Sequence, residues 1–119
     1  MPSFKFSRTA EDVKRELTAI LRTVKDPRVN GLISIVKVEL AQDYSTCKVY
    51  VSSMEGFDAA KQAVKGLTNA AGYVRRELAG RMRMRYTPQI VFIADDSIEY
   101  SARINEVLME IKRKEEHED

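Results

Sequence analysis

The chain has 119 residues and a formal net charge of +2, which is the size of one domain with a single core. No apolar run approaches the ~18 residues that cross a bilayer, and residues 1–15 lack the apolar stretch of a secretory signal, so neither is expected. Cys47 is the only cysteine, which excludes an internal disulfide and favours a reducing, cytoplasmic setting.

The small net charge hides an uneven distribution. Five arginines and one glutamate between residues 75 and 85 give +4, whereas four basic and nine acidic side chains in residues 95–119 give −5. A basic body with an acidic tail often accompanies nucleic-acid binding. The same charges would also keep a small protein soluble, so composition leaves both interpretations open.

The first predicted element is a helix that ends at Asp26-Pro27. Thr9 and Asp12 have the spacing of a capping box, and a proline steers the residue before it out of the α region. One face of this helix is apolar and holds Val13, Leu17, Ile20, Leu21 and Val24.

A β-hairpin follows, with strands predicted over residues 32–40 and 46–52 around a polar turn. The first strand is expected to have one apolar face, formed by Leu32, Val36, Val38 and Leu40. The second strand is expected to place Cys47, Val49 and Val51 on the core side. Cys47 is therefore expected to be an inert thiol, because no histidine or second cysteine is available to activate it.

A second helix is predicted over residues 59–71, where Asp58 can cap the start. Gly72 then interrupts the helical pattern before an apolar stripe resumes, and Gly80 can end the second half. Glycine disfavours a helix interior, so we expect a kink at Gly72, with a tolerated glycine in a continuous helix as the alternative.

Residues 81–85 alternate arginine and methionine, which in an extended chain would place the arginines on one side. Residues 88–94 are predicted to form a strand that is central or covered, because it is apolar on both faces. A last helix is capped by residues 95–97, and we expect its stripe of Ile104, Val107, Leu108 and Ile111 to pack on the domain. The predicted domain spans residues 1–112, followed by a charged, mobile tail over residues 113–119.

The candidate binding surface is the basic segment between residues 75 and 85. Arginine side chains are planar, charged donors that suit phosphate groups, so RNA is the expected polyanion. The candidate RNA-binding residues are Arg75, Arg76, Arg81, Arg83 and Arg85, with Arg8, Lys25 and Arg28 as a secondary group.

The predicted order, αββααβ, resembles the type II KH domain, and local motifs resemble the ribosome-binding factor A family of bacteria. The motifs are Asp26-Pro27-Arg28, residues 48–52 (KVYVS), residues 70–75 (AAGYVR), residues 81–85 (RMRMR) and Asp95-Asp96-Ser97. The resemblance covers nearly the whole chain. It implies an α+β, KH-like domain with a three-stranded sheet. It also implies a cytoplasmic protein, expected to be a monomer without a cofactor, that associates with the small ribosomal subunit and its RNA during late maturation and rRNA processing.

One departure from ordinary KH domains concerns the GxxG loop that clamps a nucleic-acid backbone. No two of the five glycines in this chain are three residues apart. The ribosome-binding factor A family replaces that loop with an interrupted Ala-x-Gly kink, which Ala70-Ala71-Gly72 matches. The resemblance therefore implies docking onto folded ribosomal RNA, not single-strand clamping.

Three other interpretations stay open. An enzyme would need clustered ligands or an activated nucleophile, but His117 is the only histidine, and helix capping is the simpler role for Asp95-Asp96. No catalytic residue and no metal site are therefore predicted. The chain could also be a general KH-like RNA-binding module without ribosomal specificity, or a protein-interaction module that uses its acidic last helix.

Overall fold

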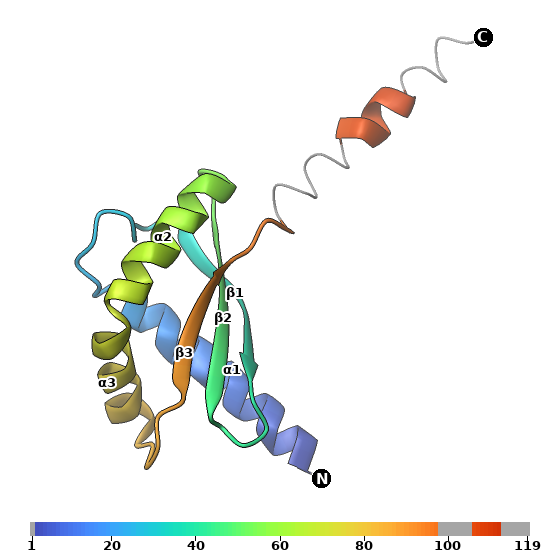
Figure 1. Cartoon of the computed structure of the whole chain (residues 1–119). Coiled ribbons are helices and arrows are strands. Elements are labelled where there is room, and N and C mark those ends of the chain that lie inside the picture. The colour runs from blue at the N-terminus through green and yellow to red at the C-terminus, as the bar shows by residue number, and fades with distance from the viewer. Residues whose placement is uncertain (1, 98–105, 113–119) are drawn as a thin grey trace.

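The computed structural model describes residues 2–97 and 106–112, with side chains from Thr9 onward. The predicted α+β class and the KH-like order αββααβ are confirmed (Figure 1). The elements are α1 (Pro2–Leu21), β1 (Ile33–Leu40), β2 (Thr46–Ser53), α2 (Phe57–Asn69), α3 (Ala71–Met82) and β3 (Gln89–Ala94), and residues 106–112 are also helical.

The sheet has three strands, as predicted, with β2 between β1 and β3. β1 pairs antiparallel with β2 through the hairpin, whereas β3 pairs parallel with β2. A parallel neighbour requires a crossover connection, and α2 with α3 supplies it. The expectation that β3 is central or covered is wrong, because β3 is an edge strand that buries Ile90 and Phe92 and leaves Val91 exposed.

The core lies between the sheet and the helices. α1 packs on β1, α2 packs on β2 and β3, and α3 packs on α1. The predicted alternation of β2 is confirmed, since Cys47, Val49 and Val51 are fully buried. The helices contribute Val13, Leu17 and Ile20 from α1, Leu67 from α2, and Val74 and Leu78 from α3.

A β-bulge changes the predicted face of β1. The strand register shifts between Ile35 and Lys37, so Val36 is an extra residue opposite β2. Because a bulge reverses the alternation of side chains, Ile35 is buried and Val36 is exposed, which corrects the prediction for Val36. Leu32 precedes the strand and is also exposed, contrary to expectation, whereas Leu40 is buried as predicted.

Both ends of α1 differ from the prediction. The helix begins at Pro2, not at Thr9, and proline suits a first helical position because its missing N–H needs no partner there. It ends at Leu21, five residues before Asp26, because the chain turns tightly after it. The backbone N–H and the Oγ1 of Thr23 both donate to the Ile20 carbonyl, at 2.9 and 2.6 Å.

The helix ends in the crossover also differ. α2 is capped by Gly56, which has a φ of 111°, and Asp58 lies in the first turn and pairs with Lys61 instead of capping. α3 continues past Gly80 to Met82 and ends at a left-handed Arg83, where the Met84 N–H donates to the Ala79 carbonyl. Residues 81 and 82 are therefore helical, so residues 81–85 are not one extended segment with the arginines on one side.

The predicted interruption of the crossover helix is confirmed, but its position is Ala70, not Gly72. Ala70 has φ −93° and ψ 9°, and its N–H donates to the carbonyls of Gly66 and Leu67. Gly72 lies inside the first turn of α3, is exposed, and has open space where a Cβ would lie. Gly72 is thus an ordinary helical glycine, and the change of direction occurs two residues earlier.

The apolar stripe of the last helix is not packed on the domain within the described residues. Val107, Leu108 and Ile111 are all exposed, which contradicts the expected packing, and Ile104 lies outside the described residues. The predicted domain limit at residue 112 and the tail over residues 113–119 stay predictions, because the tail also lies outside the described residues.

Gly66 and Gly72 offer a matched test of this geometry. A Cβ on Gly66 would lie 2.9 Å from Oδ2 of Asp26, whose carboxylate cannot easily move because Arg28 holds it. We expect Gly66→Ala to lower the free energy of unfolding by ~1–3 kcal/mol through overpacking. We expect Gly72→Ala to raise it by ~0.4–1 kcal/mol by restricting the unfolded chain. Urea unfolding curves of both variants measure the difference, and a destabilised Gly72→Ala would contradict the position assigned to the interruption.

Candidate nucleic-acid interface

The five candidate arginines lie on α3 and on the loop that connects it to β3, residues 83–88, called here the 83–88 loop. Arg75 and Arg76 lie in the first half of α3, Arg81 lies in its last turn, and Arg83 and Arg85 lie on the loop. All five are exposed. The structure therefore distributes them along one helix and its C-terminal end.

The side chains of two of these arginines also make hydrogen bonds or ion pairs within the described part of the protein. Nη1 of Arg81 lies 3.4 Å from Oε2 of Glu16, and its Nε lies 3.8 Å from Oε2 of Glu77. Arg75 donates from Nη2 to the Thr87 carbonyl at 3.1 Å, which ties α3 to the 83–88 loop. Arg81 is thus partly neutralised, and Arg75 positions the loop while its charge stays unpaired among the described residues.

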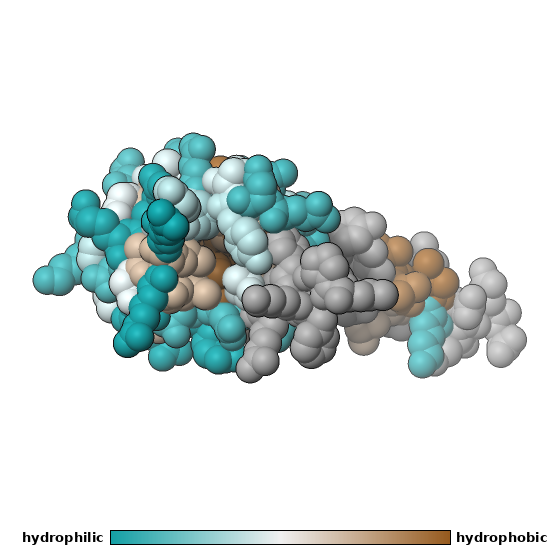
Figure 2. Space-filling model, turned by 90° about the horizontal axis from the view of Figure 1, so that it is seen from below, coloured by the Kyte–Doolittle hydropathy of each residue, from teal (hydrophilic) through white to brown (hydrophobic). Residues whose placement is uncertain are grey.

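A cavity of about 600 Å³ lies where the 83–88 loop meets the hairpin turn. Arg83 and Arg85 line it together with Tyr44 and Tyr86, and it is called here the tyrosine cavity. Figure 2 looks onto this end of the molecule and shows hydrophilic side chains around a small apolar group. Met82 and Met84 supply apolar surface to the cavity, and both pack against the hydrophobic core.

The strand register explains why these distant segments meet. Gln89 at the start of β3 lies opposite Thr46 at the start of β2, and the Gln89 N–H donates to the Ser45 carbonyl at 2.9 Å. Parallel pairing therefore brings the 83–88 loop beside the hairpin turn. Tyr44, in that turn, has a left-handed φ of 61°.

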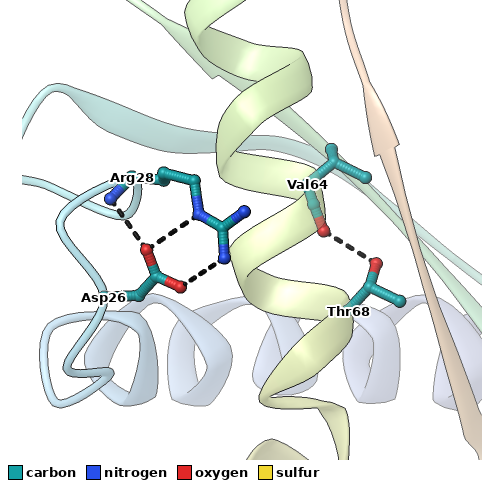
Figure 3. Close-up of polar contacts among 4 residues, drawn as sticks. All are labelled: Asp26, Arg28, Val64 and Thr68. Carbon is teal, nitrogen blue, oxygen red and sulfur yellow. Dashed lines mark hydrogen bonds and ion pairs between the residues drawn. The ribbon is translucent and has the colours of Figure 1, made fainter.

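Two of the secondary candidates, Lys25 and Arg28, do not form one surface with the arginines of the loop. Arg28 is held by Asp26, with Nη2 to Oδ2 at 2.8 Å and Nε to Oδ1 at 3.0 Å (Figure 3). Lys25 is exposed and lines a cavity of about 560 Å³ beside the interruption at Ala70. The side chain of Arg8 lies outside the described residues.

The Asp26–Arg28 pair also fixes the ionisation of its carboxyl group. The side-chain hydrogen bonds from Arg28, followed by its backbone N–H, lower the pKa of Asp26 from 3.8 to about 2. The side-chain hydrogen bonds to Asp26 raise the pKa of Arg28. On the α2 side of the interruption, Thr68 donates to the Val64 carbonyl at 2.7 Å (Figure 3). On the α3 side, the hydroxyl groups of Thr23 and Tyr73 share a hydrogen bond of 2.7 Å. Ala70, Ala71 and Gly72 thus lie in a region braced by internal contacts.

Sequence reasoning missed Tyr44 and Tyr86. Tyr86 is 78% exposed and Tyr44 is 40% exposed, so both present part of an aromatic ring at the surface. The guanidinium carbon of Arg85 lies 5.7 Å from the centre of the Tyr86 ring. The sequence could have indicated Tyr86, because it directly follows Arg85, the last arginine of the basic segment. Aromatic and basic residues together are typical of RNA-binding surfaces.

The described residues offer little for catalysis. They contain no group of three or more histidine, cysteine or acidic side chains that could hold a metal ion. Burial raises the pKa of Cys47 to about 11, so its thiol is a poor nucleophile at neutral pH. Asp95 accepts hydrogen bonds from the backbone and the hydroxyl of Ser97, which is a capping arrangement. None of the described helices is long and apolar enough to cross a bilayer.

The fold and this surface define a KH-like domain with a basic helix and an arginine-rich loop, which is a class of RNA-binding protein. The family model described as "Ribosome-binding factor A" matches residues 5–108. The chain belongs to the ribosome-binding factor A family. This finding confirms the resemblance seen in the sequence motifs.

Similar proteins cover nearly the whole chain. Ribosome-binding factor A of Caldanaerobacter subterraneus subsp. tengcongensis is 41% identical over 94% of this chain and 93% of its own length. The factor of Halothermothrix orenii is 44% identical over 92% of this chain and 89% of its own length.

Structures of ribosome-binding factor A from another bacterium are similar to the structure of this chain. The crystal structure of ribosome-binding factor A from Thermus thermophilus is 28% identical, with a TM-score of 0.66 over 74% of this chain and 92% of that one. A homology model of the Thermus thermophilus factor, fitted into a cryo-electron microscopy map of its complex with the 30S subunit, is 29% identical. Its TM-score is 0.61 over 71% of this chain and 89% of that one.

The pKa of Asp26 tests the contacts at the kink. We expect Arg28→Ala to raise it from about 2 part of the way toward 3.8, because the side-chain hydrogen bonds to the carboxylate are removed while the backbone N–H of residue 28 remains. A lowered pKa adds to the free energy of unfolding above pH ~3.8, and this contribution is lost as the pH falls toward 2. Between these two pH values the free energy of unfolding should therefore fall less in the variant than in the wild type. Carboxyl ¹³C NMR titration measures the pKa. Asp43, whose pKa is lowered by Ser45, is the internal control and should not change. A wild-type Asp26 pKa near 3.8 would contradict the arrangement.

Proposed function

We propose that this protein binds the small ribosomal subunit by contacting its RNA and assists late maturation of that subunit in the cytoplasm. The proposal is supported by membership of the ribosome-binding factor A family and by the similarity to a Thermus thermophilus factor fitted into a map of a 30S complex. The protein acts as a monomer without a cofactor. It orders or shields an immature RNA site and leaves when that site matures.

The observation that carries the proposal is the exposed arginine surface of α3 and the 83–88 loop. Arg76 and Arg83 make no ion pair within the described residues, so their guanidinium groups are available to phosphate oxygens. Each neutralised phosphate releases counterions, which makes the affinity fall as the salt concentration rises. The mechanism is therefore electrostatic docking and non-covalent, and the protein is not an enzyme.

Loss of the loop charges should weaken binding in a characteristic way. We expect the double variant Arg83→Gln, Arg85→Gln to bind the small subunit less tightly. The slope of log affinity against log salt should flatten by up to ~2, because up to two phosphate contacts are lost. Co-sedimentation with purified small and large subunits over a salt series measures both quantities. The wild type should sediment with the small subunit only.

A matched control keeps this experiment specific. Lys61 and Lys65 are exposed on α2, so Lys61→Gln, Lys65→Gln removes the same charge from another surface. The control should retain the wild-type affinity and slope. Equal effects of both double variants would point to a general charge effect and contradict the assigned interface. Equal binding to both subunits and to unrelated RNA would favour the general RNA-binding module.

The exposure of the last helix favours one alternative, a contact with a protein partner. Val107, Leu108 and Ile111 are exposed, and the negative charge of residues 95–119 suits a basic protein of the subunit. Under the RNA proposal, removal of residues 106–119 should leave subunit binding intact or slightly stronger at low salt, where charge screening is weakest. Loss of co-sedimentation with unchanged affinity for free small-subunit RNA would support the protein-binding alternative.

A further inference from the structure

The tyrosine cavity combines features that phosphate binding alone does not require. Tyr44 from the hairpin turn and Tyr86 from the 83–88 loop line the same space, although they lie far apart in the sequence. Met82 and Met84 add apolar surface to it. The volume of about 600 Å³ lies within the ~300–1,000 Å³ that is usual for small-molecule sites.

Charged side chains of both signs line the cavity, so it can contact more than a phosphate group. Asp43 also lines the cavity, and hydrogen bonds from the backbone N–H and hydroxyl of Ser45 lower the pKa of its carboxyl group. An ionised carboxylate repels a phosphate but accepts hydrogen bonds from the amino group of a base. Arg83 and Arg85 line the same cavity and can hold the flanking phosphates.

Tyr86 is the side chain best suited to stacking. It is 78% exposed and lies outside regular secondary structure, so its ring is not needed to fill the core. The guanidinium carbon of Arg85 lies 5.7 Å from the ring centre, which places a planar cation beside the ring. RNA-binding proteins stack unpaired bases on aromatic rings and guanidinium planes of this kind.

We propose that the tyrosine cavity receives an unpaired nucleobase of the bound RNA, stacked on Tyr86 and flanked by phosphates held by Arg83 and Arg85. This inference rests on the proposed RNA-binding function and specifies its ligand. The protein then prefers RNA with an extruded or bulged base over fully paired RNA. Stacking tolerates different bases, so the preference concerns the unpaired state more than the base identity.

Two matched RNA probes test this preference directly. One is a short blunt-ended RNA duplex, and the other is the same duplex with a single bulged adenosine. The wild type should bind the bulged duplex at least ~5-fold more tightly, because one stacked base is gained. Tyr86→Leu should lose this preference with an unchanged salt slope, and Tyr86→Phe should keep it, because the ring stays while the hydroxyl is removed.

A fluorescent variant gives a second readout. The chain contains no tryptophan, so Tyr86→Trp introduces a single reporter that can still stack on a base. Its emission should be quenched by the bulged duplex and much less by the blunt one. Met54 is the control for loss of an exposed apolar side chain, since it is 79% exposed beyond the far end of β2. Met54→Ala should keep the full preference.

The outcomes separate this inference from the proposed function. Equal affinity for the two duplexes, or a preference that survives in Tyr86→Leu, overturns the base site. If the wild type then still sediments with the small subunit, the proposed function stands without it. A preference that depends on the ring at position 86, in a protein that does not associate with the small subunit, supports the base site and overturns the proposed function.

Discussion

The parallel pairing of β2 with β3 is the constraint on which the rest of this structure depends. An antiparallel neighbour can follow after a short turn, but a parallel one requires the chain to return to the starting end of the sheet. α2 and α3 make that return, and β3 begins beside the hairpin turn, where Gln89 donates to the Ser45 carbonyl. The 83–88 loop must lie at the same end (Figure 1). Its arginines and Tyr44 therefore meet because of the strand pairing and not because of a direct attraction between them.

The interruption at Ala70 lets the crossover pack on two different surfaces. α2 lies on the sheet and α3 lies on α1, so the helix axis has to change direction between them. Around the interruption, Thr23 is joined to Tyr73, and Asp26 packs over Gly66 while Arg28 holds its carboxylate. The polar side chains near Ala70 therefore form hydrogen bonds and ion pairs within the protein. The other end of α3 and the loop after it expose arginines and Tyr86, so the two ends of one helix separate a structural brace from the proposed binding surface.

Local patterns in the sequence were sufficient to predict the order of elements, the buried face of β2 and the basic character of α3. They failed where tertiary contacts decide. The bulge at Val36 reverses the alternation of β1 without any glycine or proline to mark it. Gly80 was a possible end for the second half of the crossover helix, but α3 packs on α1 and continues to Met82. The tyrosine cavity could not be predicted, because Tyr44 and Tyr86 become neighbours only through the register of β3.

Under the proposed function, the end of the molecule that carries the 83–88 loop faces RNA in the small subunit. Photo-cross-linking tests it most directly, with benzoylphenylalanine in place of Tyr86 in one variant and of Met54 in another. Both positions are highly exposed, and they lie beside opposite ends of the sheet. After irradiation of each complex with small subunits, cross-links to the subunit RNA should form from position 86 and not from position 54. Cross-links from position 54 alone would contradict the claim.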